Sequence, residues 1–514
     1  MYNQNQKVHF VGIGGVGMAG IAEVLLTLGY RISGSDVRPS QLTEHLQKLG
    51  AEIVFGHSPD NIPNETHVLV KSSAILDDNP ELIEARLQNI PIIPRAEMLA
   101  ELMRMKYGIA VAGSHGKTST TSMTAKILKE LGFDPTVIIG GRVLSQDTGA
   151  SLGSGQYLIA EADESDGSFC LLRPAIAIVT NIDREHMSHY HSFGALEEAF
   201  LSFMNSVPFY GLVVYCGDDP ILKRLIERVG RKSLSYGLDP LHDVAALNMT
   251  FDGWNSEFDL MVKGANCGRV IIPVPGKHMV SNALAAIAVS LELGAYPDEC
   301  IQSLRNYPGV ARRTERIGER SFSPGRSCLF IDDYGHHPAE IKATLRAIKG
   351  GILPKQEFPS RLIVIFQPHR YTRTRELFSE FITAFEDADL VFILPIYAAG
   401  ETEIEGITGE GLAQALIHPA CRYVSSFDDL PLLLEGEAHG NDIIVTMGAG
   451  SVGKYSRILC GTSKENDSSL SSNSSTARIG NEKLSSTLEA SQDVENRNIN
   501  SADKYEREAV ITHS

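Results

Sequence analysis

The sequence predicts an α/β protein built from three consecutive α/β units and followed by a disordered tail. Short apolar runs alternate with amphipathic segments, which is typical of a mainly parallel sheet covered by helices. This pattern starts at residue 7, restarts at 107 and starts a third time near 327. A chain of 514 residues is also too long for one core, and about three domains is the usual expectation.

The first unit begins with a glycine-rich loop. Strands are predicted over 7–14, 30–36, 51–56 and 67–73, and helices over 18–28 and 41–49. Gly12, Gly14 and Gly17 form a GxGxxG pattern between a strand and a helix, where backbone N–H groups can approach a phosphate. Asp36 follows the next strand, at the place of the acid in a dinucleotide site. By local pattern alone, this Rossmann-like unit favours NAD(P) and an NAD(P)-dependent oxidoreductase.

The second unit carries another glycine loop, VAGSHGKTST. A strand is predicted to end at Ala112 and a helix to begin near Lys117, so the loop between them forms an anion site. Lys117 suits the β- and γ-phosphates of a nucleotide, and the Thr118 hydroxyl suits Mg²⁺. Only Gly113-x-x-Gly116-Lys117-Thr118 of the common motif is present, and the alternative is an ordinary helix start. The flanking strand and helix favour a P-loop-type nucleotide-binding unit, and a later helix of this unit is predicted over 282–293.

Two polar stretches follow later strands of the second unit. EADESDGSF begins at Glu161 and places four carboxylates within six residues, and TNIDREHMSHYHSF contains Asp183, Glu185 and His186. Carboxylates so close together repel one another unless cations or helix N-termini offset their charge. Alone, an acidic turn and a histidine-rich loop are most often solvated surface. Beside a phosphate loop, they indicate ligands for a divalent cation.

The third unit has predicted strands over 327–334, 361–367, 390–396 and 442–448, which indicates a second Rossmann-like domain. From about Thr462 the chain is rich in Ser, Asn and Glu and almost without aromatic residues. Such a segment cannot bury enough apolar surface to offset its ordering entropy, although a partner-docking role is an alternative. We therefore expect three domains and a disordered tail, spanning 1–105, 106–317, 318–461 and 462–514.

Composition excludes several classes of partner. The net charge of −17 argues against a general nucleic-acid-binding surface, although a local positive pocket for a small anion is compatible with it. Seven cysteines are scattered singly, without a CxxC pair, which is typical of a reducing compartment. We see no signal peptide and no apolar run near the ~20 residues of a membrane span. The sequence predicts a cytoplasmic protein with small-molecule substrates and leaves its oligomeric state open.

Eight blocks along residues 7–458 resemble the Mur ligases. They are HFVGIGGVGMAGIAEVLLTLGYRISGSD, GSHGKTSTTSM, EADESDGSF, TNIDREHM, PGKHMVSNALAA, DDYGHHPAEI, FQPHRYTRT and MGAGSVGK. The resemblance implies that the first domain binds the UDP of a sugar nucleotide, the second binds ATP, and the third closes over both with an amino acid. It further implies an ATP-dependent ligase that joins L-alanine to the lactyl carboxylate of UDP-N-acetylmuramate in peptidoglycan synthesis, with Mg²⁺. The first glycine loop would then approach a UDP diphosphate rather than NAD(P).

The resemblance also implies roles for individual residues. The UDP-sugar would be bound by Gly12, Gly14, Gly15, Gly17, Asp36 and Ser72. ATP would be bound by Gly113, Ser114, His115, Gly116, Lys117, Thr118, Ser119, Asn282, Arg313, Asp333 and His336. The metal ligands would be Thr118, Glu161 and His186, and the amino acid would meet Tyr334, His369, Arg370 and Arg373. Among these, Lys117, His186 and Arg370 would act in catalysis.

These residue types suit the joining of a carboxylate to an amine. A carboxylate is a poor acyl donor, so transfer of the γ-phosphoryl group of ATP to it would form an acyl phosphate, which the amine then attacks. Lysine, arginine and Mg²⁺ lower the repulsion between the two anions. Arg370 and Arg373 are three residues apart and can grip a carboxylate from one helix face, although an exposed basic helix start is the alternative. A histidine such as His186, or solvent, would take the proton of the amine.

The sequence departs from the family pattern in three places and leaves alternatives open. Met279 stands where an asparagine is usual, Thr314 where an aromatic residue usually follows two arginines, and Gly335 in place of an alanine. No lysine follows His186 before Lys223, so we expect no carbamylated lysine. A ligase that recycles a whole tripeptide onto the same nucleotide shares most of these motifs. A non-catalytic nucleotide-binding module is the third alternative.

Overall fold

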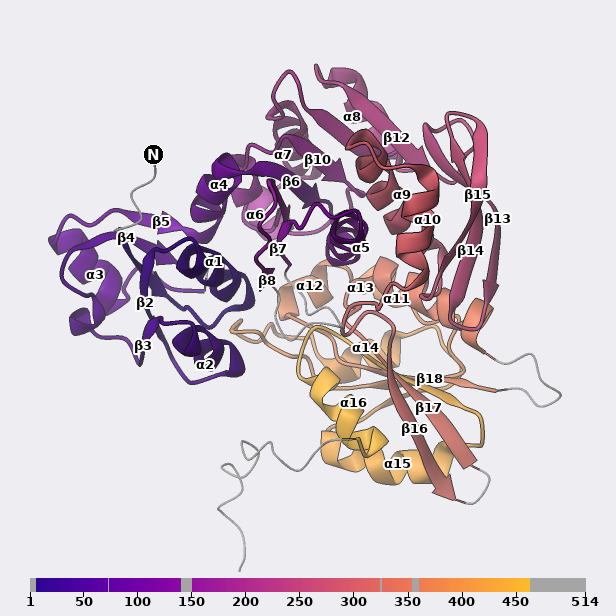
Figure 1. Ribbon diagram of the computed structural model, residues 1–514. Helices are drawn as coiled ribbons and strands as arrows, with labels where there is room; N and C mark the ends of the chain where they lie inside the picture. Colours follow the sequence, from indigo (N-terminus) through magenta and orange to yellow (C-terminus); the bar gives the residue numbers. More distant parts are fainter. Residues whose placement is uncertain (1–5, 73, 140–149, 324–325, 354–359, 463–514) are drawn as a thin grey trace, which may run out of the picture. The chain divides into compact units, whose positions relative to one another are not determined.

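The computed structural model describes residues 6–72, 74–139, 150–323, 326–353 and 360–462. The tail predicted to be disordered lies outside the described residues, apart from Thr462. The described residues form three sheets in chain order, which confirms the predicted fold class of three consecutive α/β units (Figure 1). Among the described helices, none combines the length and the apolarity that crossing a bilayer requires.

The first sheet is fully parallel and has the strand order β3-β2-β1-β4-β5. Its strands are β1 (Lys7–Val11), β2 (Arg31–Asp36), β3 (Glu52–Phe55), β4 (Thr66–Lys71) and β5 (Ile92–Pro94). Its helical segments are α1 (Val16–Thr27), α2 (Gln41–Lys48), η1 (Pro59–Asn61), α3 (Pro80–Leu87) and α4 (Arg95–Met105). The order reverses at β1, between β2 and β4, and such a reversal opens a crevice for ligands at the carboxyl ends of the strands. The first glycine loop follows β1 and therefore lies at this crevice.

A buried polar network supports the first sheet beneath that crevice. The fully buried Glu81 carboxylate contacts His9 Nε2 at 3.0 Å, accepts from Ser35 Oγ at 2.8 Å and from Asn61 Nδ2 at 2.9 Å, and also contacts His57. Burial opposes its charge, but these hydrogen bonds outweigh burial and lower the pKa of Glu81 to about 2. The network ties β1, β2, the segment after β3 and α3 together.

The second sheet has ten strands, in the order β15-β14-β13-β12-β11-β10-β6-β9-β7-β8. They are β6 (Tyr107–Ala112), β7 (Thr136–Ile138), β8 (Ala150–Ser151), β9 (Tyr157–Glu161), β10 (Ile176–Val179), β11 (Leu212–Cys216), β12 (Ser233–Gly237), β13 (Val244–Asp252), β14 (Asn255–Val262) and β15 (Ala265–Ile272). The helical segments are α5 (Lys117–Glu130), η2 (Ser168–Leu171), α6 (Met187–Tyr190), α7 (Phe193–Asn205), α8 (Pro220–Leu225), η3 (Ile226–Arg228), α9 (Lys277–Glu292) and α10 (Pro297–Arg305). The strands that flank β6 are parallel to it, so the polar ends of β6, β9 and β10 meet at one edge.

The third sheet has the order β16-β17-β21-β18-β19-β20, and only the β16–β17 pair is antiparallel. Its strands are β16 (Glu315–Ser323), β17 (Arg326–Asp333), β18 (Leu362–Phe366), β19 (Leu390–Ile393), β20 (Cys421–Tyr423) and β21 (Ile443–Met447). Its helical segments are α11 (Pro338–Ala347), η4 (Ile348–Ile352), α12 (Tyr371–Glu376), α13 (Phe378–Phe381), α14 (Gly409–Ala415), η5 (Phe427–Asp429), α15 (Leu430–Glu437) and α16 (Val452–Cys460). β16 begins three residues before the expected boundary at 318.

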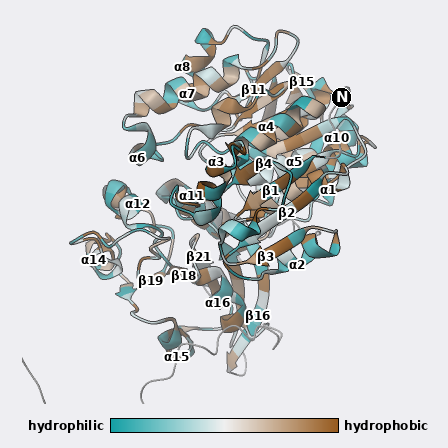
Figure 2. Ribbon diagram, turned by 90° about the vertical axis from the view of Figure 1, so that its left-hand side faces the viewer, coloured by the Kyte–Doolittle hydropathy of each residue, from teal (hydrophilic) through white to brown (hydrophobic). Residues whose placement is uncertain are grey.

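The apolar residues divide between the units as the sheets require. One buried cluster runs from Val8 to Val310 and joins the first two units. The third sheet has a separate cluster on each face, because successive residues of β18 point to opposite sides. Figure 2 shows brown, hydrophobic strands such as β1 and β4, whereas α12 is mainly teal. The hydrophilic groups that remain at the strand ends form the site described next.

Candidate active site

The glycine loop after β1 is held by Asp36 at the end of β2. Asp36 Oδ2 accepts a hydrogen bond from Gly14 N at 2.7 Å, and Asp36 Oδ1 accepts one from Val37 N at 2.8 Å. A Cβ atom on Gly14 would lie 2.8 Å from Asp36 Oδ2, and one on Gly12 would lie 3.1 Å from Ser72 Cβ. The structure therefore brings Gly12, Gly14, Asp36 and Ser72 together, and Asp36 Oδ2 already holds the loop.

The end of this loop meets an arginine that sequence reasoning missed. Gly15 is the N-cap of α1 and has no side chain to cap the helix, which leaves the helix N-terminus open to an anion. A Cβ atom on Gly17 would lie 3.1 Å from the Arg95 guanidinium, at the start of α4. Arg95 also contacts Asp163 Oδ2 of the second unit at 3.7 Å. The sequence signal was weak, because Arg95 lies almost 80 residues from the loop that it faces.

The phosphate loop runs from the end of β6 to the start of α5 and is held by the end of β10. His115 N donates to Asn181 Oδ1 at 2.8 Å, and Thr180 Oγ1 donates to His115 O at 2.6 Å. Gly116 is the N-cap of α5 with a φ of 83°, and a Cβ atom there would lie 2.5 Å from Asn282 Oδ1. Asn282, on α9, therefore closes against the loop only because residue 116 is glycine.

Lys117 is engaged by a buried carboxylate. Its Nζ donates to Glu164 Oε1 at 2.9 Å and Oε2 at 2.8 Å, and to Gly113 O at 2.5 Å. Burial opposes the charge of Lys117, but the carboxylates of Glu164 and Asp163 outweigh it and raise the Lys117 pKa. Burial raises the pKa of Glu164 to about 7, against the effect of Lys117. The Lys117 ammonium group thus lies at the N-terminus of α5, where a phosphate can replace Glu164 as its partner.

Carboxylates and an imidazole gather near Lys117 and fit a divalent cation. Ligand atoms of Glu164, Glu185 and His186 lie within 4.8 Å of one another. Glu185 Oε1 is buried and accepts no hydrogen bond in the described structure, and Arg373 Nη2 lies 3.4 Å from it. Buried oxygens of this kind suit Mg²⁺. Of the expected ligands, His186 belongs to this group, while Thr118 is buried in the first turn of α5 and Glu161 ends β9.

Thr314 directly precedes the β16–β17 pair, whereas Asp333 and Gly335 lie at its end, and Asp333 contacts both of the other two residues. Asp333, at the end of β17, accepts from Thr314 N and from Gly335 N, each at 2.7 Å. Burial raises its pKa to about 6, against the effect of Arg313. A Cβ atom on Gly335 would lie 2.7 Å from Asp333 Oδ1. The departures Thr314 and Gly335 therefore have one structural role in common, because both donate backbone N–H groups that hold the Asp333 carboxylate.

The residues expected around the amino acid lie together, with one difference in detail. Arg373 Nη1 lies 3.2 Å from His369 Nδ1, and the His369 ring lies 5.9 Å from the His336 ring. Burial and the neighbouring cationic groups lower the His369 pKa to about 3. The Tyr334 ring faces Arg313 at 5.2 Å and also contacts Arg312. Helix α12 begins at Tyr371, so the exposed Arg370 is its N-cap rather than part of the same helical turn as Arg373.

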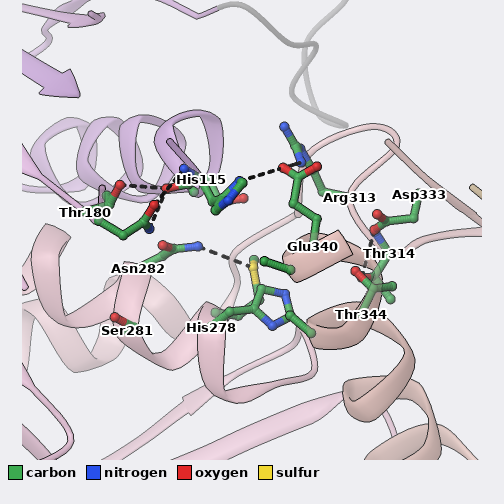
Figure 3. A pocket seen from close by; sticks show the side chains of 16 residues that line it. His115, Thr180, His278, Ser281, Asn282, Arg313, Thr314, Asp333, Glu340 and Thr344 are labelled. Atoms are coloured by element: carbon green, nitrogen blue, oxygen red, sulfur yellow. Dashed lines mark hydrogen bonds and ion pairs between the residues drawn. The ribbon is translucent and has the colours of Figure 1, made fainter. Parts of the chain in front are cut away.

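A cavity of about 220 Å³ lies between the phosphate loop, α9 and the start of α11 (Figure 3). Of the expected ATP ligands, it is lined by His115, Gly116, Ser119, Asn282, Arg313 and Asp333. It is also lined by residues that the sequence did not single out, among them Thr180, Asn181, His278, Ser281 and Thr344.

Helix α9 starts at Lys277, five residues before the predicted helix start at Asn282. For that reason the sequence did not indicate His278 and Ser281 as lining residues. The departure at Met279 also has a structural role in this helix. The Met279 Sδ atom accepts a hydrogen bond from Asn282 Nδ2 at 3.7 Å, within one helical turn (Figure 3). The thioether thus orients the carboxamide group.

Three family models match consecutive parts of the chain. "Mur ligase family, catalytic domain" matches residues 7–107, "Mur ligase middle domain" matches 111–290, and "Mur ligase, glutamate ligase domain" matches 312–450. The chain belongs to the Mur ligase family. The two glycine loops lie within the first two matches, and the β16–β17 pair with the arginines of α12 lies within the third.

Individual relatives cover nearly the whole described chain. UDP-N-acetylmuramate–L-alanine ligase of Geobacter sp. (strain M21) is 51% identical over 456 residues, which are 88% of this chain and 96% of the relative. The enzyme of the same name from Pelobacter propionicus is 49% identical over 466 residues, 89% of this chain and 98% of the relative. The crystal structure of UDP-N-acetylmuramate-alanine ligase from Thermotoga maritima matches with a TM-score of 0.73 and 28% identity, over 88% of this chain and 98% of that chain.

A murein peptide ligase shares the fold at lower identity. The murein peptide ligase of Psychrobacter arcticus matches with a TM-score of 0.64 and 24% identity, over 89% of this chain and 98% of that chain. This likeness shows the fold alone.

Proposed function

We infer that the protein is an ATP-dependent ligase that joins L-alanine to the lactyl carboxylate of UDP-N-acetylmuramate, forming ADP and phosphate in peptidoglycan stem-peptide synthesis. The observation that carries this inference is the identity of about half of the aligned residues, over nearly the full length of the relatives, to ligases named for this substrate pair. Small-molecule substrates fit the cavity and the two glycine loops. We place the reaction in the cytoplasm, with no nucleic-acid partner.

The chain's own groups support phosphoryl transfer followed by amide formation. The lactyl carboxylate attacks the γ-phosphorus of ATP, the bond to ADP breaks, and an acyl phosphate forms. The amine of L-alanine then attacks the acyl carbon, and phosphate leaves with the electrons of the C–O bond. Lys117, released from Glu164, offsets the charge on the transferring phosphoryl group, and Arg313 approaches it from the third unit. The proton of the amine passes to a base such as His186 or to solvent.

We propose that the first unit binds the uridine nucleotide at the crevice after β1. Gly12, Gly14 and Gly15 present backbone to the diphosphate, and Arg95 adds a positive charge beside Gly17. The NAD(P) alternative loses its main support, because both Asp36 oxygens hold backbone N–H groups and a second phosphate loop has no evident use in a dehydrogenase. The tripeptide-recycling alternative is not favoured, because the enzyme of that type is less similar than the alanine ligases.

We propose that Mg²⁺ is held by His186 with the carboxylates beside it, together with Thr118 and Glu161. When bound, the cation neutralises phosphate charge and polarises the phosphoryl group. The support comes from the buried Glu164, Glu185 and His186 group described above. Arg370 and Arg373, with His369 and Tyr334, are proposed to receive the amino acid and the sugar carboxylate.

A panel of amino acids tests the proposed function. The purified chain is mixed with ATP, Mg²⁺ and UDP-N-acetylmuramate, and phosphate release is measured with L-alanine, glycine, L-serine or the stem tripeptide. Release should be fastest with L-alanine and should need the sugar nucleotide. Faster release with the tripeptide would favour the recycling reaction instead. Calorimetric titration with NADH and with UDP-N-acetylmuramate is the second measurement, and tight NADH binding would overturn the assignment.

A further inference from the structure

A chain of alternating charges links the phosphate loop to the third unit at the edge of the cavity. His115, in the loop before α5, contacts Asp183 Oδ2 through Nε2 at 3.1 Å. Its other nitrogen, Nδ1, lies 3.5 Å from Glu340 Oε1 (Figure 3). Asp183 follows β10 of the second unit, whereas Glu340 lies in the first turn of α11 in the third unit. One imidazole ring therefore spans the two units.

The two oxygens of the Glu340 carboxylate make different contacts. Oε2 accepts from the backbone N–H groups of His336 at 3.0 Å and His337 at 3.3 Å, which completes the capping box of α11. Oε1 faces His115 and also accepts from Arg313 Nη1 at 3.4 Å. The same oxygen thus meets the phosphate loop and the arginine expected to reach the ATP phosphates.

His115 suits an ion pair with carboxylates better than it suits a metal ion. Burial opposes its charge, but the hydrogen bond to Asp183 and the attraction of the Glu340 carboxylate raise the His115 pKa to about 10. Its ligand atom also lies within 4.8 Å of those of Asp183 and His337, an arrangement open to a metal ion. A protonated imidazole has no lone pair for a metal, and its two N–H groups each need a carboxylate. Asp183 meets Nε2 at hydrogen-bond distance, and Glu340 faces Nδ1 at ion-pair distance from the opposite side.

We propose that Glu340 is a positioning residue, which docks the third unit onto the phosphate loop through His115 and with the same oxygen holds Arg313 at the phosphate site. The proposal rests on the proposed function, since it concerns how this ligase orders its ATP site. Arginine has a long and mobile side chain, and fixing it beforehand favours catalysis by placing its charge before the substrate arrives. The docking contact and the arginine are thereby coupled through one carboxylate.

The sole tryptophan of the chain reports on this docking. Trp254 lies in the turn between β13 and β14 of the second unit, and it packs against the apolar core of the third unit. A Cβ atom on Gly351 would lie 3.0 Å from Gly253 O, so η4 contacts the same turn. Since η4 continues directly from α11, which carries Glu340, the fluorescence of Trp254 is expected to change when the third unit moves.

Two substitutions of His115 separate its two nitrogens. The amide nitrogen of glutamine reaches the position of Nε2, so His115→Gln keeps the Asp183 contact and loses the Glu340 contact. The amide nitrogen of asparagine stands near the position of Nδ1, so His115→Asn does the reverse and is the matched control. Glu340→Gln removes the charge at the other end but retains an oxygen for the capping box. His115→Gln/Glu340→Gln completes a double-mutant cycle.

Single variants at the contact should each raise the KM for ATP about tenfold, with the KM for UDP-N-acetylmuramate unchanged. The KM for ATP of the double variant should be no higher than that of the more impaired single variant, because the two residues contact each other and their effects are coupled. His115→Asn should raise the KM for ATP less than His115→Gln does, because it keeps the contact with Glu340. The Trp254 fluorescence change on adding MgATP should be diminished in His115→Gln and Glu340→Gln alike.

Losses that multiply in the double variant, or equal damage from His115→Asn and His115→Gln, would overturn the proposal. If Glu340→Gln does not fold, Glu340→Asp repeats the test, because its carboxylate falls one methylene short of His115 and should lose ATP affinity to a similar degree. A wild type without alanine-dependent phosphate release would refute the proposed function instead. The docking contact is then still tested by titrating MgATP into each variant and following Trp254.

Discussion

Replacement of Gly116 by alanine should damage the nucleotide site more than the fold. Gly116 has a φ of 83°, and an alanine in this left-handed region costs about 1–2 kcal/mol. The new Cβ atom would also lie 2.5 Å from Asn282 Oδ1, and such overpacking adds roughly 1–3 kcal/mol unless the carboxamide moves. Asn282 is proposed to contact the nucleotide, and a displacement of about 1 Å at such a site can cost up to ~100-fold in rate.

The same helix provides a matched control. Gly132 follows α5 with a φ of 78°, and a Cβ atom there would meet nothing within 4 Å. Gly132→Ala should therefore lower the free energy of unfolding by about 1 kcal/mol and leave the KM for ATP unchanged. Gly116→Ala should lower it further and raise the KM for ATP at least tenfold. Urea unfolding and initial rates against ATP concentration measure the two effects, and equal behaviour of the two variants would refute the reasoning.

Three other predictions follow from the site, the first sheet and the tail. Lys117→Ala should abolish phosphate release, because the charge at the helix N-terminus is lost, while calorimetry should show UDP-N-acetylmuramate still binding to the first unit; loss of both would point to misfolding. The pKa of Glu81 is lowered in the folded state from its ordinary value of 4.5 to about 2, so its contribution of about 3 kcal/mol is present above pH 4.5 and lost as the pH falls towards 2. The difference in unfolding free energy between the wild type and Glu81→Gln should accordingly shrink from pH 6 to pH 3, and a constant difference would contradict this. Removal of residues 463–514 should leave the rate unchanged, since every proposed site residue precedes them; a large loss of rate would show that the tail takes part.

The local pattern of the sequence determined the units and the two loops of this protein. The strand ending at Ala112 and the helix beginning at Lys117 lie where the sequence predicts them, because an apolar run, a glycine loop and a helix start are coded within about 25 residues. The same is true of the start of β1, of α2 beginning at Gln41, and of β17, β18, β19 and β21 in the third unit, whereas β16 and β20 were not predicted. The start of α9 was less well predicted, because its N-cap, Gly276, has no side chain that would mark the beginning of a helix.

Only the tertiary structure decided which charged groups meet. Asp36 is the last residue of β2, but its hydrogen bond to Gly14 arises because β1 and β2 are neighbours in the sheet. Lys117 and Glu164 are 47 residues apart, and His115 and Glu340 belong to different units. The periodicity of apolar residues predicts local helices and strands. These pairs depend instead on strand order and on the packing of one unit against the next. For that reason most groups of the site could be predicted from the sequence, whereas their contacts are determined by the tertiary structure.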